Sequence, residues 1–353
     1  MLTDIFAYRY LDHPIWQSYT EVEQRLLNQA LSIVKEFLPY YDSQGKELES
    51  QKAKWKSLHD QLARELGVDE LSKRYYSYSQ KNALGQEWPV QGFFGWNYVC
   101  EQYIKAPISA NHLDPDRFIK ERISFIELAF RLRGSEIAEL NAKLPTALKE
   151  AEFRDKTPSR GMRLPGSAVN GVKAWNETQN AAFTAYVGEL NERFRRARAP
   201  LTYHNGFIQV SADEVIEQHI AKPFWDAVAD PLWRNVDIDM KEALDRRDSN
   251  DKDPAIFAAK ALESAIKIVS DSKGWTRGNE SGASNYIDNL VSKANGSYLA
   301  SWEGEMLRDY FRKVRNPLGH GPGSDPMPVL STPQTDWAIE TAMSWVRTLV
   351  RRM

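Results

Sequence analysis

Apolar side chains recur every three to four residues along most of this chain, and this helical period most limits the folds it can adopt. Such stripes are typical of amphipathic α-helices that bury one face against a neighbour. The alternation expected of a strand is clear in one short stretch. We therefore expect a mainly α-helical protein. The clearest helical stripes lie in residues 22–37, 118–132, 173–198 and 256–269, and the strand pattern lies in residues 201–210.

Several sequence signals mark where helices begin. Thr20 and Glu23 form a capping box, in which the threonine oxygen and the glutamate carboxylate satisfy amides of the first helical turn. Ser211 and Glu214 repeat this pattern. Pro115 suits the first turn of a helix, because the amide donor that proline lacks would have no partner there. Each of these signals predicts a helix that follows it directly.

Glycine and proline indicate two long loops. Residues 77–95 contain Gly85, Pro89 and Gly92 and are expected to form a loop. Residues 154–171 hold further glycines and prolines among basic side chains. Loops of that length are often functional or disordered.

An Asn-Gly pair at positions 205 and 206 stands between two apolar runs. It is the strongest short-range signal for a β-hairpin, because both positions tolerate a positive φ. We predict a hairpin over residues 201–210. His204 lies beside the turn and follows Arg198 with five residues between them, but Pro200 separates the two. We interpret this Arg–His pair as structural rather than catalytic.

A change of composition divides the chain. Nearly every residue in 245–254 is charged or polar and difficult to bury, which predicts a linker or an exposed turn. We expect a helical sensor or regulatory region over residues 1–250 and a second domain over residues 251–353. The second domain shows four helical patterns, which is typical of a small four-helix bundle.

The composition is that of an ordinary soluble globular protein, with 353 residues of which 42% are apolar. The net charge of −2 gives no overall attraction to nucleic acid or membranes, so such binding must use a local patch. Cys100 is the single cysteine and the six histidines lack metal-binding spacing, so we expect no metal and no other cofactor. The chain shows no secretion signal and no membrane-spanning stretch, which predicts a cytoplasmic protein without a membrane partner.

Residues 308–321 combine the end of a helix with a cation and a histidine. Pro317 is expected to stop the helix, because proline lacks an amide donor and biases the preceding residue away from helical geometry. The glycines at positions 319 and 321 let the backbone turn freely around His320. Arg315 would then lie in the last helical turn, with His320 on an exposed loop beyond it. A permanent cation beside a group that titrates near neutral pH suits chemistry on a phosphodiester.

Structural interpretations of the same residues remain open. A histidine that follows a helix-stopping proline can hydrogen-bond a carbonyl left free at the helix end. Arg308, Arg312 and Arg315 recur at helical spacing, and a basic face of that kind usually contacts solvent. Glu263 is equally compatible with a surface salt bridge and with a site. The large aromatic residues of the helices are expected to be buried, namely Trp175, Trp302, Trp337 and Trp345.

The C-terminal hundred residues resemble the HEPN superfamily, and more narrowly the C-terminal domain of bacterial abortive-infection proteins of the AbiJ type. The resemblance rests on a helix with Ala261-Leu262-Glu263-Ser264, a variable loop, and a helix that ends in Arg315-Asn316-Pro317-Leu318-Gly319-His320-Gly321. The superfamily signature is an arginine, a polar residue, a few variable residues and a histidine that glycine often follows. With the preceding hairpin segment, the resemblance covers about residues 200–353, whereas residues 1–200 resemble no family.

This resemblance implies a metal-independent endoribonuclease that cuts RNA during phage infection and leaves a 2′,3′-cyclic phosphate. His320 would act as general base or general acid, and Arg315 would stabilise the charge of the pentacoordinate phosphorane. Asn316 would hydrogen-bond the imidazole or a phosphate oxygen, and Glu263 would orient one of the two catalytic side chains. The basic residues expected to bind the RNA backbone are Arg308, Arg312 and Lys313.

The same resemblance suggests partners and two alternative functions. RNA is the expected substrate, with tRNA among the candidates, and the chain is expected to form a homodimer through its C-terminal domain. A phage component would be the trigger, or a cognate antitoxin the inhibitor. The alternatives are a catalytically silent HEPN scaffold that binds RNA or a partner, and a HEPN toxin neutralised by a nucleotidyltransferase antitoxin.

Overall fold

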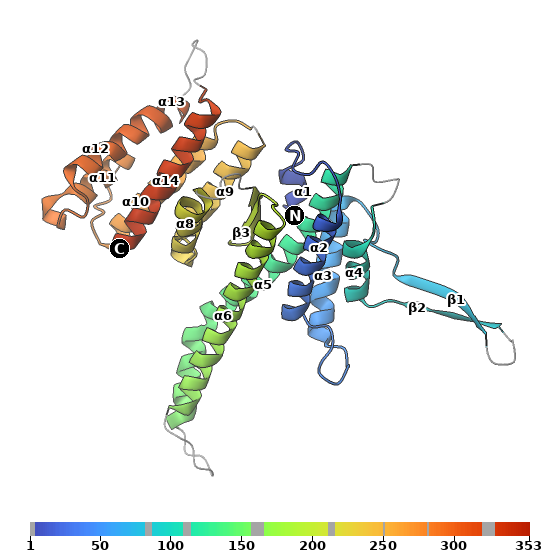
Figure 1. Ribbon diagram of the computed structural model, residues 1–353. Helices are drawn as coiled ribbons and strands as arrows, with labels where there is room; N and C mark the ends of the chain where they lie inside the picture. Colours follow the sequence, from blue (N-terminus) through green and yellow to red (C-terminus); the bar gives the residue numbers. More distant parts are fainter. Residues whose placement is uncertain are drawn as a thin grey trace. The chain divides into compact units, whose positions relative to one another are not determined.

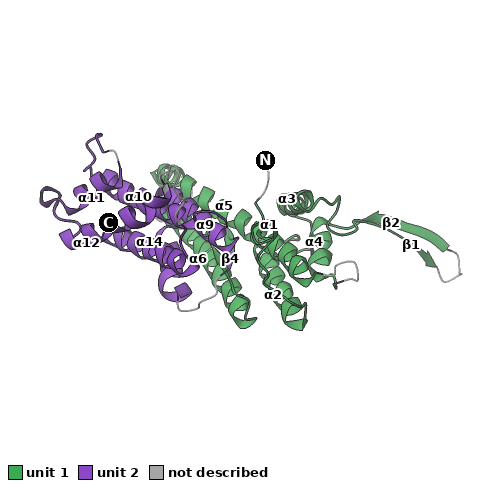
Figure 2. Ribbon diagram, turned by 90° about the horizontal axis from the view of Figure 1, so that it is seen from above, with its two compact units in different colours: residues 1–208 green, residues 209–353 purple. Residues whose placement is uncertain are grey.

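The protein is mainly α-helical, as the sequence predicts, and its chain forms two compact units, residues 1–208 and 209–353 (Figure 2). The fold is described from a computed structural model. The structure describes residues 4–81, 87–108, 114–156, 166–210, 216–249, 251–280, 282–319 and 329–353.

Helix α5 is the centre of unit 1, with α1, α2, α3 and α6 packed against it. From Phe118 to Phe130 nearly every side chain of α5 is buried, polar ones included. The buried Lys120, for example, donates from Nζ to the backbone oxygen of His13 at 2.7 Å. The helices of unit 1 are α1 (Phe6–Arg9), α2 (Glu21–Phe37), α3 (Glu49–Leu66), α4 (Trp96–Lys105), α5 (Pro115–Lys156) and α6 (Ser167–Arg196).

Two of the three helix starts expected from sequence signals lie among the described residues, and both are confirmed. The Thr20 side chain accepts from the Val22 amide, and Glu23 accepts from the Thr20 amide at 2.7 Å, which completes the expected capping box of α2. Helix α5 begins at Pro115. The second expected capping box, at Ser211 and Glu214, lies outside the described residues.

The long helices α5 and α6 form an antiparallel pair (Figure 1). Polar side chains connect them along the pair, as between Asn141 Nδ2 and Asn180 Oδ1 at 2.9 Å. Near the end of α5, Asp155 accepts from the Ala168 amide at 3.0 Å and so caps the first turn of α6. The expected helix at 173–198 therefore begins earlier, at Ser167.

A buried carboxylate joins three parts of unit 1. The side chain of Glu127 on α5 is fully buried and pairs with Arg9 of α1 and with Arg131, whose Nη2 lies 2.8 Å from Oε1. Its Oε2 also accepts from the Ile208 amide at 2.7 Å. A buried charge is tolerated when it is paired and hydrogen-bonded in this way.

The hairpin over residues 201–210 is confirmed, with β3 (Leu201–His204) and β4 (Phe207–Val210) as a two-stranded sheet. Asn205 and Gly206 both adopt a positive φ, at 42° and 95°, as a tight hairpin turn requires. The His204 side chain is buried in this hairpin.

The loop predicted for residues 77–95 is wrong. Strands β1 (Tyr75–Lys81) and β2 (Glu87–Phe93) pair there as a second antiparallel hairpin. Glycine and proline in this segment suggested a loop, but both are compatible with a strand whose outer edge is open. Gly92 has a specific role, because a Cβ at this position would lie 2.6 Å from Oη of Tyr76.

Unit 2 is built around α10, whose many alanines allow neighbouring helices to approach closely. It packs against α9, α11, η4 and α14. All four helices expected in this part of the chain are present, and position 250 falls between α9 and α10 within unit 2. The elements are η1 (Glu217–Ala221), α8 (Lys222–Ala227), η2 (Pro231–Trp233), α9 (Arg234–Asp248), α10 (Pro254–Ser272), α11 (Ala283–Val291), η3 (Lys293–Asn295), α12 (Ser301–Tyr310), η4 (Phe311–Arg315), α13 (Asn316–Gly319) and α14 (Thr332–Arg352).

Three of the four tryptophans expected in the core are exposed instead. The exposed fractions of Trp175, Trp302 and Trp337 are 53%, 61% and 56%, whereas Trp345 is partly buried against the core. On α14 the core side is occupied by neighbouring residues such as Ala338 and Ile339. Residue size alone did not indicate which side of each helix faces inward.

Candidate functional site

The helix that carries the Arg–His motif does not stop at Pro317, contrary to the prediction. Helix α12 continues through η4, a π-helical turn over Phe311–Arg315, into α13. In a regular α-helix the proline ring would clash with the carbonyl four residues earlier. The wider π turn changes the position of the preceding carbonyls, so the chain remains helical past the proline. Such turns are frequent at functional sites.

Unit 2 contains the same arrangement a second time. The π turn η1 over Glu217–Ala221 leads into α8, in which Pro223 is the second residue. Pro317 is likewise the second residue of α13. In both places a five-residue π turn ends two positions before a proline. The shared sequence signal is a proline within a helical pattern, and of the two prolines only Pro317 was expected to stop its helix.

The structure brings together two of the predicted site residues, Arg315 and Glu263. Arg315 is the last residue of η4, and Glu263 lies on α10. The distance from Nη2 of Arg315 to Oε2 of Glu263 is 3.6 Å. Oε1 of Glu263 also lies 2.8 Å from Nζ of Lys267. The carboxylate, with 13% of its side chain exposed, therefore lies between two cations.

The Arg315 side chain is partly exposed, whereas other side chains of the same π turn are buried. About a third of the Arg315 side chain is exposed, at 35%. Phe311 and Val314 of the same turn are buried. Tyr310, just before the turn, donates from its hydroxyl to the Ala338 carbonyl at 3.0 Å, which connects the turn to α14. Burial raises the pKa of this Tyr310 hydroxyl well above its ordinary value, so it remains a donor.

Of the other two predicted catalytic residues, the structure describes Asn316. Asn316 follows the π turn directly and is exposed to solvent. Leu318 is buried and anchors the end of α13. His320 lies outside the described residues.

The three residues predicted to bind RNA are all paired with acidic side chains of unit 2. Arg308 pairs with Asp288 of α11, Arg312 pairs with Asp309, and Nζ of Lys313 lies 3.5 Å from the same Asp309. Arg312 and Lys313 keep 70% of their side chains exposed. Exposed ion pairs contribute roughly 0–1 kcal/mol and are weakened by salt, so a phosphate can replace the carboxylate.

A pocket of about 330 Å³ lies beside α13 and was not anticipated from the sequence. Leu318, Val329 and Leu330 provide apolar lining. Its basic lining comes from the segment that was expected to be a linker, and it comprises Arg246, Arg247 and Lys252. These cations are close to acidic neighbours, as between Arg247 Nη2 and Asp248 Oδ1 at 2.7 Å.

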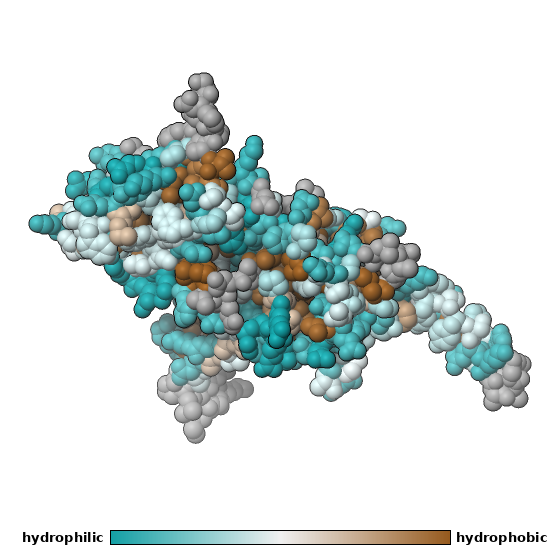
Figure 3. All heavy atoms as spheres, turned by 45° about the horizontal axis from the view of Figure 1, so that its top comes forward, coloured by the Kyte–Doolittle hydropathy of each residue, from teal (hydrophilic) through white to brown (hydrophobic). Residues whose placement is uncertain are grey.

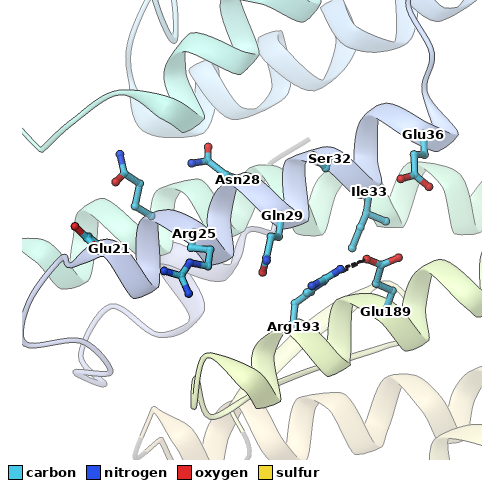
Figure 4. Close-up of a pocket in the computed structure, with 10 residues that line it drawn as sticks. Glu21, Arg25, Asn28, Gln29, Ser32, Ile33, Glu36, Glu189 and Arg193 are labelled. Carbon is cyan, nitrogen blue, oxygen red and sulfur yellow. Dashed lines mark hydrogen bonds and ion pairs between the residues drawn. The ribbon is translucent and has the colours of Figure 1, made fainter.

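A larger and more open pocket, of about 590 Å³, lies in unit 1 between α2 and α6 (Figure 4). Its charged side chains are of both signs and include Arg25, Glu36 and Glu189. Arg193 pairs with Glu189 on its own helix, with Nη2 to Oε1 at 2.6 Å. Mixed charge of this kind does not indicate one class of ligand.

The described residues contain no group of three or more histidine, cysteine, aspartate or glutamate side chains arranged to hold a metal ion. A further search of the same residues found no helix with the length and apolar character needed to cross a membrane.

The fold and these sites define a two-unit, mainly helical protein with an Arg–Glu pair at a π turn. Its residues 4–226 match the model of a protein family, AbiJ N-terminal domain 4, and this match covers more than half of the chain. The chain belongs to this family and is an abortive-infection protein of the AbiJ type. No curated protein and no solved structure matches it.

The family match falls largely on residues 1–200, for which the sequence alone had suggested no family. The AbiJ resemblance is therefore supported through the N-terminal part of the chain rather than through the C-terminal motif. The likeness of residues 251–353 to HEPN nucleases stays a hypothesis.

Proposed function

We propose that unit 2 is a metal-independent endoribonuclease and that this activity is the effector of abortive infection. The single observation that carries the proposal is the Arg315–Glu263 pair at the π turn. A carboxylate from another helix holds a partly exposed arginine five residues before His320. Arg315 would supply the held cation, and His320, which follows it on the same chain segment, would supply the acid–base group for phosphodiester cleavage.

The proposed reaction begins when neutral His320 removes the proton of a ribose 2′-hydroxyl. The 2′-oxygen then attacks the adjacent phosphorus, and Arg315 stabilises the charge of the pentacoordinate phosphorane. The bond from phosphorus to the 5′-oxygen breaks, and a protonated imidazole gives its proton to that oxygen. The products are a 2′,3′-cyclic phosphate and a 5′-hydroxyl.

Glu263 and Asn316 have supporting roles in this proposal. Glu263 is a positioning residue, because it contacts Arg315 and would orient the guanidinium toward the phosphate. The exposed Asn316 is free to reach a phosphate oxygen or the imidazole.

RNA binding would use the exposed cations on both sides of the motif. Arg312 and Lys313 precede Arg315 on the same helix, with Arg308 one turn earlier. The pocket beside Leu318 adds a basic lining that can contact a phosphate, and apolar side chains that can contact a base. Unit 1, which carries most of the family match, would sense infection or restrain the nuclease.

Incubation of the full-length protein with total cellular RNA, with and without EDTA, tests the proposal. We expect cleavage in both conditions and a 2′,3′-cyclic phosphate end. Arg315→Ala and His320→Ala should each lower the rate by roughly 10²–10⁴-fold. Arg277→Ala and His219→Ala are matched controls, because both residues are exposed in the same unit. RNA binding without cleavage would indicate the silent scaffold, and loss of activity in EDTA would contradict the mechanism.

A further inference from the structure

The pocket of about 330 Å³ in unit 2 lies close to the proposed catalytic residues. Leu318, which lines it, follows Arg315 by three residues, or about one helical turn. Ala255, another lining residue, lies eight residues before Glu263 on α10, which corresponds to about 12 Å along the helix. One RNA strand can therefore contact Arg315 and also place a nucleotide in the pocket.

The pocket offers surfaces on which a flat ring can lie. Leu318, Val329 and Leu330 supply apolar lining. The guanidinium carbon of Arg246, a further lining residue, lies 4.3 Å from the ring centroid of Phe257, which supports the guanidinium plane from one side. Unpaired RNA bases stack on arginine planes in this way. In the space-filling view, apolar residues of unit 2 form small patches among hydrophilic ones (Figure 3).

The two arginines of the pocket are already balanced by carboxylates. Arg246 pairs with Glu242 at 2.6 Å and with Asp251 at 3.3 Å. Nη2 of Arg247 lies 2.7 Å from Oδ1 of Asp248. A phosphate inside the pocket would have to compete with these carboxylates for the same cations. The interior therefore favours a neutral ring with polar edges over a phosphate group.

Lys252 and Asp253 also line the pocket and are available to a ligand. Within the part of the chain that the structure describes, neither side chain forms an ion pair. Asp253 precedes α10, but its side chain makes no capping hydrogen bond to that helix. Lys252 is exposed, so its ammonium group can contact a backbone phosphate at the edge of the pocket. The less exposed Asp253 carboxylate is an acceptor without a donor, so it requires donors on the ligand.

A carboxylate that accepts hydrogen bonds from a base distinguishes guanine from the other three RNA bases. Guanine carries the N1–H and the N2 amino group next to each other on one edge, whereas adenine, cytosine and uracil each have a single donor group there. Only guanine can therefore donate to both carboxylate oxygens at once. In a duplex the same donors are used in the base pair, so a guanine bound in this way must be unpaired.

We propose that this pocket binds an unpaired guanine of the RNA substrate, beside the phosphodiester that is cleaved. Asp253 would accept from N1 and from the N2 amino group, Leu318 and Arg246 would contact the ring, and Lys252 would contact the phosphate of the same nucleotide. The inference rests on the proposed function for its substrate, and it adds which base the protein selects. Asp253 touches no reacting atom and determines specificity.

Cleavage of short single-stranded RNAs by the full-length protein in EDTA tests this preference. Each RNA has one guanosine in an otherwise uridine sequence, and in matched RNAs inosine or adenosine replaces it. Inosine differs from guanosine only by the missing N2 amino group. We expect the wild type to cut beside guanosine. The inosine RNA should be cleaved roughly tenfold to a hundredfold more slowly, as expected for the loss of one hydrogen bond to a charged group.

The substitution Asp253→Asn should remove the preference for guanosine over inosine. The asparagine amide nitrogen is a donor and cannot accept from the N2 amino group. The backbone of Asp253 has a positive φ of 58°, which asparagine also tolerates, so the variant should fold and melt like the wild type. Asp271→Asn, which changes an exposed carboxylate near the other end of α10, is the matched control and should keep the preference.

Binding measurements separate this inference from the proposed nuclease activity. His320→Ala in the full-length protein prevents cleavage, so fluorescence anisotropy can measure its affinity for the labelled guanosine and inosine RNAs. Guanosine-selective binding that is lost on adding Asp253→Asn would support the guanine pocket, even if the wild type cleaves no RNA and the nuclease proposal fails. Equal cleavage or equal binding of the two RNAs, no binding of either, or a preference that persists in Asp253→Asn would overturn the inference.

Discussion

Arg315, for which we propose a role in RNA cleavage, is held by residues of another helix. Its guanidinium is partly exposed, and Glu263 limits the directions in which it can point. Lys267 is a competing partner, 2.8 Å from the other carboxylate oxygen. The position of Arg315 therefore depends on two residues of α10.

The contact leads to a prediction for Glu263→Gln. The amide keeps the size of the side chain but loses the charge that orients Arg315, and a small displacement of a catalytic group can lower the rate by up to about 10²-fold. We expect a lower kcat for RNA cleavage with little change in KM. Lys267→Gln is the matched control and should not lower kcat. A rise in KM with an unchanged kcat would show that Glu263 affects RNA binding rather than the position of Arg315.

A second residue-scale prediction concerns Glu303, which connects α12 to the C-terminal end of α14. Its carboxylate accepts from both Nη atoms of Arg352, at 3.0 and 2.7 Å, and from the Ala300 amide at 2.8 Å. The Arg352 hydrogen bonds are the main cause of a pKa below the ordinary glutamate value. The lowered pKa means that the folded state favours the ionised form. The stabilisation is therefore present above about pH 4.3, the ordinary value, and is lost as the pH falls through the lowered pKa.

We expect Glu303→Gln to lower the free energy of unfolding at pH 7 by about 1.5–3 kcal/mol, the range for hydrogen bonds to charged groups. The difference between variant and wild type should shrink as the pH is lowered below 4. Urea unfolding of the variant and the wild type at pH 7, 5 and 3 measures this difference in unfolding free energy. A difference that is constant over this range would show that the carboxylate charge is not involved.

At the scale of elements, the π turns show why the helix ends were difficult to predict. Proline is a strong helix breaker in a regular α-helix, and this was the basis for ending the motif helix before residue 317. The chain instead keeps Phe311, Val314 and Leu318 buried by widening one turn. Burial of these apolar side chains, each stabilising by about 1.5–3 kcal/mol, is enough to offset the loss of regular helical geometry.

Pro317→Ala should therefore alter the site rather than unfold it. Alanine restores the amide donor and removes the cause of the wide turn, so the helix can return to regular α geometry and rotate Arg315 away from Glu263. We expect an unchanged or slightly higher Tm together with a clear fall in RNA cleavage. Pro223→Ala, in the equivalent position after η1, should leave cleavage unchanged. Equal activity of both variants would mean that the π turn has no role in catalysis.

On the scale of the whole molecule, the two units have separate cores. Leu27 of α2 and Leu262 of α10 are both fully buried, one in each unit. Leu→Ala at such positions costs about 2–5 kcal/mol. By calorimetry we expect Leu27→Ala to shift one unfolding transition and Leu262→Ala to shift the other. A single transition that both variants lower equally would show that the units unfold cooperatively.

The sequence by itself determined the local features of this protein. Helical periodicity, the Thr20 capping box and the Asn-Gly turn each depend on neighbouring residues, and each was confirmed. Family membership is likewise carried by the sequence, although it lies in residues 4–226 rather than in the C-terminal motif.

Only the tertiary structure decided the features that depend on distant residues. Glu263 meets Arg315 because α10 packs against the π turn, and no local pattern contains that contact. The exposure of Trp302 and Trp337 depends on how each helix is rotated against its neighbours. The β1–β2 hairpin forms because residues of the two strands pair along their whole length, the three tyrosines of β1 included, despite the proline and glycine that indicated a loop. In each case the physical reason is the same: burial and pairing across the fold outweigh the preference of a residue for one local conformation.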